Sequence, residues 1–215
     1  MTKLVDTPRG PAQVHLHRVD KPRAGLVLGH GAGGGVDSPD LVGATEAANS
    51  ASLTVALIEQ PYRVAGRRAP APARQLDEAW LTVVPQLFPD LPLIVGGRSL
   101  GARVACRTAA ELEAKAVLCL AFPVHPPGKP ERVRDEHLYR ITVPMLFIEG
   151  TADPFAKPEI VRRVLGKLGR VAEHVAIEGG DHSFNVRGKK RDAREVGETL
   201  AGLAAPFVLR VAGAG

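Results

Sequence analysis

The stretch LIVGGRSLGARVA, residues 93–105, decides how we interpret the fold. An apolar run leads into glycines on both sides of one serine, in the pattern G-R-S-L-G at 97–101, and a helical pattern follows. A strand that turns abruptly into a helix strains the central residue of the turn and brings its neighbours close together. Glycine at Gly97 and Gly101 avoids the clash, so we expect the turn to present the Ser99 hydroxyl above a sheet. A glycine-rich structural turn with an incidental serine is the simpler alternative.

Apolar runs of similar length recur along the chain and predict the strands of that sheet. They cover 25–31, 53–61, 92–97, 116–122, 143–150 and 174–179. The runs are continuous rather than alternating, which is typical of parallel strands covered on both faces. Helical patterns fill the intervals, and a Pro-Arg-Gly-Pro turn at 8–11 predicts an N-terminal antiparallel hairpin. We therefore expect residues 1–215 to form one α/β domain, with a mostly parallel central sheet, helices on both faces and no large cap domain.

The composition argues against several classes of protein. Hydrophobic residues make up 45% of the chain, which provides a core and excludes disorder. The net charge of +5 raises the question of nucleic acid, but the basic residues occur without interleaved aromatics or a known nucleic-acid motif. They form local clusters at Arg63, Arg67 and Arg68 and at Arg187, Lys189, Lys190 and Arg191. We expect these charges to be solvated and no nucleic acid to be a partner.

The location and redox state follow from what the sequence lacks. The first residues show no signal peptide, and no run of about 18 apolar residues is apparent, so we expect no membrane span and a cytoplasmic protein. Cys106 and Cys119 have no CxxC partner and are expected to be reduced packing residues. We expect no metal and no cofactor, and the sequence makes no prediction of the oligomeric state.

Reactive side chains follow three of the predicted strands. Ser99 lies in the turn described above, Asp153 lies in EGTADPF at 149–155, and His182 lies in EGGDHSF at 178–184. Ligands of open α/β sheets bind beyond the carboxyl ends of the strands, so these loops are expected to meet at one edge. A serine hydroxyl needs a base to accept its proton, and an aspartate orients the imidazole that does so. The order serine, aspartate, histidine is that of the α/β hydrolases.

An acyl-transfer site also needs backbone N–H donors for the developing oxyanion. The N–H of Leu100, which follows the serine, is one candidate. The loop GHGAGGGVDSPD at 29–40 supplies the other, and we expect it to be that of Ala32, because the small residues there allow the backbone to approach.

The same loop also fits the dinucleotide-binding pattern Gly29-x-Gly31-x-x-Gly34, with Glu59 at the end of the next strand as a ribose-binding acid. In that family of sites the loop runs directly into its helix. Here several residues intervene and Pro39 indicates a later helix start, so we favour the oxyanion interpretation.

The chain resembles the α/β-hydrolase superfamily over nearly its full length, and more narrowly the small cap-less proteins related to dienelactone hydrolases. That group includes a testis-expressed protein and the hydrolase-like domain of a chromatin-complex subunit. The matching segments are HGAGG, EQPYRVAGRRAP, GGRSLGARVA, FPVHPPGKPERVRDEHL, FIEGTADPF and GGDHSF. The resemblance implies Ser99 as nucleophile, Asp153 as acid and His182 as base. Dienelactone hydrolases themselves usually carry cysteine at the position of Ser99.

Loops around this site are expected to contact the substrate. The candidates are His30, Gly31, Arg63, His125 and Phe155. The alternative is a purely structural role, in which prolines stiffen these loops and their charges are solvated.

Two functions follow from the sequence. The first is a serine hydrolase that cleaves a small acyl ester or thioester through an acyl-enzyme. The second is a non-catalytic binding or scaffold module with a hydrolase shape, whose mark would be a missing member of the triad.

Overall fold

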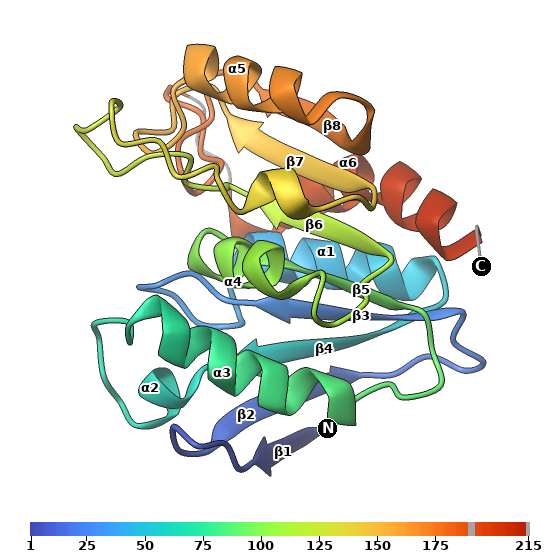
Figure 1. Cartoon of the computed structure of the whole chain (residues 1–215). Coiled ribbons are helices and arrows are strands. Elements are labelled where there is room, and N and C mark those ends of the chain that lie inside the picture. The colour runs from blue at the N-terminus through green and yellow to red at the C-terminus, as the bar shows by residue number, and fades with distance from the viewer. Residues whose placement is uncertain (189–191, 214–215) are drawn as a thin grey trace.

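The computed structural model describes residues 1–188 and 192–213 of the chain. Within this part an eight-stranded sheet has the order β1-β2-β4-β3-β5-β6-β7-β8 (Figure 1). The strands are β1 Thr2–Val5, β2 Ala12–His17, β3 Ala24–Gly29, β4 Leu53–Glu59, β5 Leu93–Arg98, β6 Ala116–Leu120, β7 Met145–Gly150 and β8 Ala172–Ile177. β1 and β2 form an antiparallel hairpin, β2 pairs antiparallel with β4, and the six strands from β4 to β8 are parallel. The predicted α/β architecture and N-terminal hairpin are confirmed.

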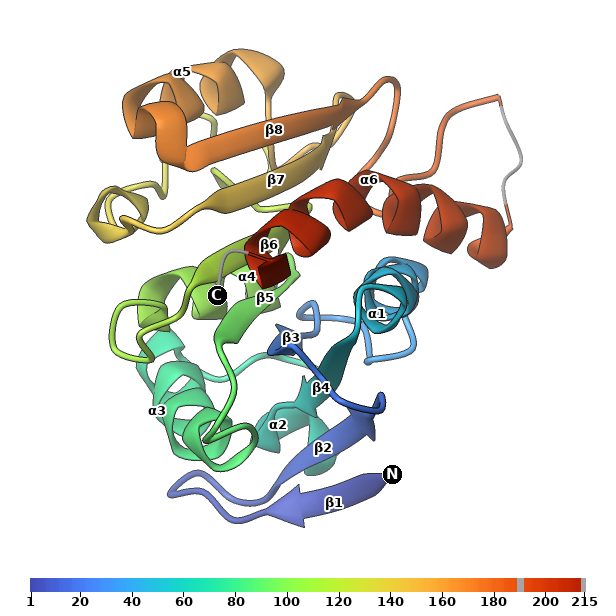
Figure 2. The same ribbon diagram turned by 90° about the vertical axis from the view of Figure 1, so that its right-hand side faces the viewer.

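Helices cover both faces of the sheet. They are α1 Pro39–Ser50, α2 Pro61–Val64, α3 Ala73–Val83, α4 Leu100–Thr108, α5 Pro158–Leu168 and α6 Ala193–Gly213. Figure 2 shows α1 and α6 side by side on one face, with α3 and α4 on the opposite face. The residues between β6 and β7 contain only a 3-10 turn, Leu138–Arg140, so no lid domain is inserted at this point of the chain.

Each face of the sheet packs its own hydrophobic core. Trp80 of α3 and Val104 of α4 pack with inward side chains of the central strands on one side. Leu41 of α1 and Leu200 of α6 pack with the alternate residues of the same strands on the other side. Because both faces of the central strands are covered, their side chains are apolar without alternation.

One strand departs from the prediction. The run at 174–179 was expected to be buried, but β8 is the last strand of the sheet, and Glu173 and His174 are exposed. An edge strand is covered less completely than a central one, so polar side chains are tolerated along it.

The loop after β3 supports the oxyanion interpretation over the dinucleotide one. β3 ends at Gly29 and α1 begins only at Pro39, as the position of the proline predicted. Glu59, the candidate ribose-binding acid, instead lies 3.5 Å from the His15 ring, measured from Oε2 to Nε2.

The C-terminal helix corrects one expectation about apolar runs. α6 is long and apolar enough to cross a membrane by length and composition, although no such run was apparent in the sequence. Its packing gives a different reason for that composition, because Leu200, Ala204 and Val208 are fully buried against α1 and the sheet.

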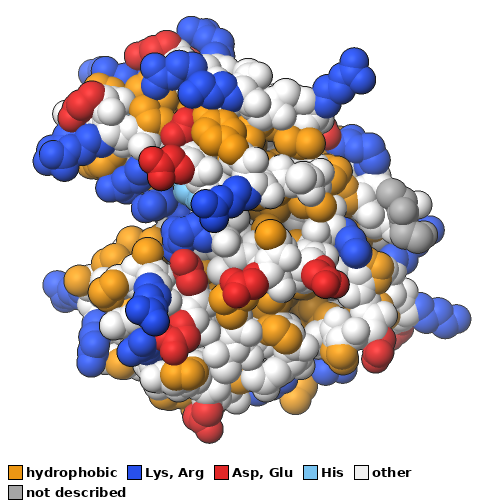
Figure 3. Space-filling model, in the orientation of Figure 1, with side chains coloured by type: hydrophobic (Ala, Val, Ile, Leu, Met, Phe, Trp, Pro, Cys, Tyr) orange, Lys and Arg blue, Asp and Glu red, His pale blue; other side chains and the backbone are white. Residues whose placement is uncertain are grey.

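The basic clusters can be placed only in part. Lys189, Lys190 and Arg191 lie outside the described residues. Figure 3 shows Lys and Arg side chains interspersed with Asp and Glu on the face that carries α3 and α4.

Candidate active site

The turn between β5 and α4 has the strained geometry that its sequence predicts. Ser99 has φ 50° and ψ −105°, a conformation that a residue with a side chain adopts only when its surroundings enforce it. The Cβ of any residue at Gly97 would lie 2.4 Å from the carbonyl oxygen of Gly29, and one at Gly101 would lie 2.1 Å from it. The close approach of β3 therefore requires glycine on both sides of the serine.

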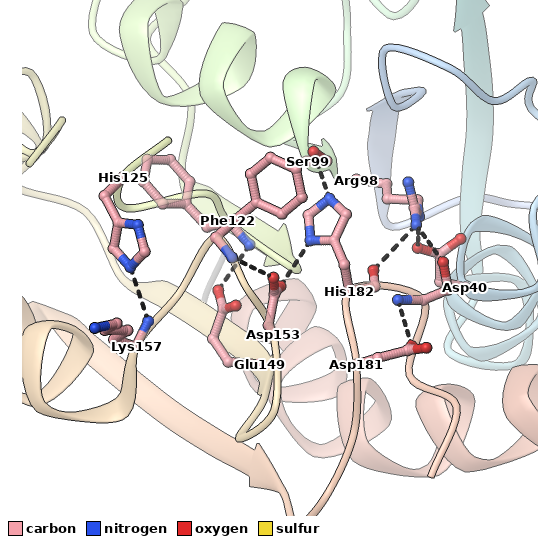
Figure 4. A network of polar contacts seen from close by, with 12 residues as sticks. Asp40, Arg98, Ser99, Phe122, His125, Glu149, Asp153, Lys157, Asp181 and His182 are labelled. Atoms are coloured by element: carbon pink, nitrogen blue, oxygen red, sulfur yellow. Dashed lines mark hydrogen bonds and ion pairs between the residues drawn. The ribbon is translucent and has the colours of Figure 1, made fainter. Parts of the chain in front are cut away.

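Ser99, His182 and Asp153 come together at the carboxyl edge of the sheet (Figure 4). The Ser99 Oγ lies 2.9 Å from the His182 Nε2, and the His182 Nδ1 lies 2.7 Å from the Asp153 Oδ2. The other Asp153 oxygen accepts a hydrogen bond of 2.8 Å from the Phe155 N–H. With the imidazole proton on Nδ1, the ring donates to the carboxylate and can accept the serine proton on Nε2. The Asp153 carboxylate is fully buried, whereas the imidazole reaches the surface.

A pocket of about 640 Å³ opens beside the serine. The lining comprises Ala32, Gly33, Gly34, Ser38, Pro39, Asp40, Arg98, Ser99, Phe155, His182, Ser183, Asn185, Ala193 and Val196. The Phe155 ring packs on the imidazole, with 4.4 Å between the ring centres. Ala32 lies in the lining and Leu100 is the first residue of α4, so the two predicted oxyanion donors lie on segments next to the serine.

Two of the predicted substrate contacts have other partners. His30 donates from Nδ1 to the Gly31 carbonyl, 2.7 Å away, and accepts at Nε2 from the Gln60 N–H, 3.1 Å away. Burial lowers the pKa of this imidazole, which favours the neutral ring that both bonds need. We expected His30 to contact substrate. The structure does not bring the ring to the pocket: it is buried outside the pocket lining and fixes two loops.

His125 repeats this arrangement on the other side of the site. It donates from Nδ1 to the Pro126 carbonyl at 2.8 Å and accepts at Nε2 from the Lys157 N–H at 3.1 Å. The ring is fully buried and joins the loop after β6 to the start of α5, so the structure does not bring it to the pocket either. Arg63 lies in α2 and is not part of the pocket lining among the described residues.

Arg98 and Asp40 form a buried ion pair at the site that the sequence does not predict. The Arg98 Nε lies 2.7 Å from the Asp40 Oδ2, and its Nη2 donates to the His182 carbonyl and the Ser183 Oγ, each at 3.0 Å. Its Nη1 lies where a side chain at Gly31 would be, 2.6 Å from the Cβ position. The position of Arg98 directly before the serine was the available signal, but a variable residue is expected there.

Glu149 is a second buried carboxyl group, close to that of Asp153. Its Oε1 accepts a hydrogen bond of 2.7 Å from the Phe122 N–H, and its Oε2 has no partner among the described residues. Burial, assisted by the neighbouring charge of Asp153, raises the pKa of Glu149 well above its ordinary value of 4.5. The folded protein therefore favours the neutral acid at this position.

The raised pKa predicts how Glu149 affects stability across pH. Above about pH 4.5 the unfolded chain releases this proton while the folded chain retains it, so stability falls as the pH rises toward the folded pKa. Glu149→Gln keeps an acceptor for the Phe122 N–H and removes the titration. We expect the melting temperature of the variant to exceed that of the wild type by a margin that grows from pH 5 to pH 8, measured by thermal unfolding. An equal margin at every pH would contradict the assignment.

Residues 22–207 match the family described as the alpha/beta hydrolase domain. The chain belongs to this family. Among solved structures it is similar to an α/β serine hydrolase without a lid from Xanthomonas campestris, with 23% identity, a TM-score of 0.75, and coverage of 98% of this chain and 93% of that chain. It is also similar to a dienelactone hydrolase from Anabaena variabilis, with 22% identity, a TM-score of 0.70 and coverage of 98% and 96%.

A third similar structure is Est1E from Butyrivibrio proteoclasticus bound to ferulic acid, with 16% identity, a TM-score of 0.76 and coverage of 98% of this chain and 99% of that chain. These likenesses extend over the whole fold and agree with the family match. The predicted resemblance to the α/β hydrolases is confirmed by the family match, and the fold is that of the lid-less hydrolase and the dienelactone hydrolase.

Proposed function

We propose that this α/β hydrolase cleaves small acyl esters or thioesters, with Ser99 as nucleophile, His182 as general base and Asp153 as the acid that orients it. The observation that carries the proposal is the unbroken hydrogen-bonded relay from the Ser99 Oγ through the imidazole to a buried carboxylate. The family match supports the reaction class, and the strained serine supports its role, because strain of this kind is concentrated at functional sites.

The proposed reaction proceeds in two steps. The Ser99 Oγ attacks the acyl carbon while its proton passes to the His182 Nε2, and the N–H groups of Ala32 and Leu100 stabilise the oxyanion. The imidazolium then gives its proton to the departing alcohol or thiol, which leaves an acyl group on Ser99. A water molecule hydrolyses this ester by the same steps, and the serine is regenerated. Asp153 remains ionised throughout and stabilises the imidazolium.

The pocket favours a small substrate over a long lipid chain. Its volume of about 640 Å³ lies within the range of small-molecule sites, and small and polar residues dominate its lining. Phe155 and Val196 are the large apolar side chains of that lining, and they suit a compact acyl or aryl group. The ferulic acid bound by Est1E is a compact aryl acid of this kind, so feruloyl esters belong in the first substrate screen.

A fluorophosphonate probe tests the proposal directly. We expect it to label the wild type, to spare Ser99→Ala, and to label Ser50→Ala as it does the wild type, because Ser50 is exposed at the end of α1 away from the site. The same proteins are then assayed on p-nitrophenyl esters of increasing chain length, on feruloyl esters, on thioesters and on lactones.

The outcomes separate the two candidate functions. Labelling at Ser99 with turnover of short esters supports a hydrolase. A wild type that is neither labelled nor active, yet captures a stable macromolecular partner as well as Ser99→Ala does, would contradict the proposal and favour the scaffold module.

The cytoplasm is the proposed location, in keeping with the free thiols of Cys106 and Cys119.

A further inference from the structure

Arg98 links three segments that surround the candidate nucleophile. Its guanidinium pairs with Asp40 in the first turn of α1 and donates to the backbone and side chain of the loop at 182–183. It also occupies the space that a side chain at Gly31, in the loop after β3, would need. Figure 4 shows the side chain extended from the turn before Ser99 toward both Asp40 and the His182 loop. One side chain therefore connects the turn of Ser99 to the loop that carries His182 and to α1.

The ion pair between Arg98 and Asp40 is largely buried. Only 3% of the Asp40 side chain and 14% of the Arg98 side chain are exposed. The other Asp40 oxygen accepts the backbone N–H of Leu41 at 3.0 Å, so the carboxylate is fixed by its own helix. A buried carboxylate that loses its cation strongly destabilises the fold, so the Arg98 guanidinium is kept against Asp40. Because Asp40 is itself fixed, this pairing holds the guanidinium in one orientation. In that orientation Nη2 faces the His182 carbonyl.

We propose that Arg98, oriented by Asp40, is a positioning residue that fixes the loop carrying His182 relative to Ser99. The inference rests on the proposed role of His182 as the base. The relay needs the Nε2 within hydrogen-bond distance of the serine, and a displacement of about 1 Å can lower a rate about 100-fold. The hydrogen bond from Arg98 holds the backbone carbonyl of His182, the residue whose ring must be placed. Arg98 is also the residue directly before Ser99.

Lysine cannot reproduce this arrangement. A guanidinium presents N–H groups in a rigid planar fork, so it pairs with Asp40 through Nε while it donates through Nη2 to the histidine loop. An ammonium is a point charge on a flexible stem and can satisfy Asp40 without reaching the His182 carbonyl. Arg98→Lys therefore keeps the charge balance of the buried pair while it removes the link to the loop.

Arg107→Lys is the matched control. Arg107 forms a two-pronged ion pair with Asp77, with 2.8 Å between Nε and Oδ2. Its side chain is 17% exposed, close to the value for Arg98, and it lies on α4 outside the pocket lining. The two variants therefore replace arginines of similar burial, and only Arg98 touches the histidine loop.

Two measurements on the full chain test the inference. Hydrogen exchange of peptides covering 178–188 is expected to be faster in Arg98→Lys than in the wild type and unchanged in Arg107→Lys. The kcat for a short p-nitrophenyl ester is expected to fall about 10- to 100-fold in Arg98→Lys, with KM changed by about twofold or less. Arg107→Lys is expected to retain the wild-type kcat within about twofold.

The outcomes are distinct from those that test the proposed function. Unchanged exchange at 178–188 in Arg98→Lys would overturn the inference whether or not the protein hydrolyses esters. A rise in KM at unchanged kcat would also overturn it, because Arg98 would then contact substrate rather than place the histidine. If the wild type shows no labelling at Ser99, the proposed function fails, and the exchange measurement still decides whether Arg98 orders the loop.

Discussion

Replacing His182 with alanine is expected to lower kcat for a short ester by about 10⁴- to 10⁶-fold. The imidazole is the only base within hydrogen-bond distance of the Ser99 Oγ among the described residues, at 2.9 Å. Without it the hydroxyl must attack while it still carries its proton, and the leaving group departs without a proton donor. Steady-state assays on p-nitrophenyl acetate measure this loss. His174→Ala, on the exposed edge strand β8, is the control and is expected to remain within about twofold of the wild type.

Replacing the buried Asp153 tests whether it acts through His182. Asp153→Asn removes the charge that holds the Nδ1 proton in place, and a loss of about 10⁴-fold in kcat is expected. Because the three groups act as a unit, the double variant with His182→Ala should be no slower than His182→Ala alone. Multiplicative losses would contradict the relay, since they would mean that Asp153 and His182 act independently.

Gly101→Ala is expected to have the largest effect on stability. Alanine favours a helix over glycine by about 1 kcal/mol, and Gly101 lies in α4, so propensity alone predicts stabilisation. A Cβ at this position would, however, lie 2.1 Å from the carbonyl oxygen of Gly29 and 2.3 Å from its carbon. Both are backbone atoms of β3, the strand next to β5, so relief requires the sheet and the helix to separate. We expect the free energy of unfolding to fall by about 3 kcal/mol.

Gly166→Ala provides the matched control for this clash. Gly166 lies within α5, and a Cβ there would meet no atom within 4 Å. The same substitution should therefore raise the free energy of unfolding, by about 0.5–1 kcal/mol. Urea unfolding of the two variants measures both changes. A rise in the free energy of unfolding in Gly101→Ala would show that helix propensity, not the contact with β3, governs this position.

The strands, and the loops after them that carry the reactive side chains, were predictable because local sequence patterns determine both. Continuous apolar runs mark buried parallel strands, and the carboxyl ends of such strands meet at one edge. The positions of Ser99, Asp153 and His182 at that edge follow from the runs that precede them. The exposure of β8 does not follow, because a run of residues does not reveal whether its strand has one neighbour or two.

The side chains around the site were less predictable. His30 and His125 both follow strands, as a ligand-binding residue would, and only the structure shows that backbone groups occupy both nitrogens of each ring. The pairing of Arg98 with Asp40 joins residues far apart in sequence, and no local pattern distinguishes it from two solvated charges. Contacts of this kind depend on tertiary packing rather than on periodicity.

The central claim is that Ser99 becomes acylated with the help of His182, and rapid mixing with p-nitrophenyl acetate tests it most directly. The account predicts a burst of p-nitrophenol equimolar with the protein, followed by slower turnover, and an acetyl group on the peptide that contains Ser99 when the reaction is quenched in acid. Turnover with neither a burst nor an acetylated Ser99 would contradict this claim. An acetyl group found on another residue instead of Ser99 would also contradict it.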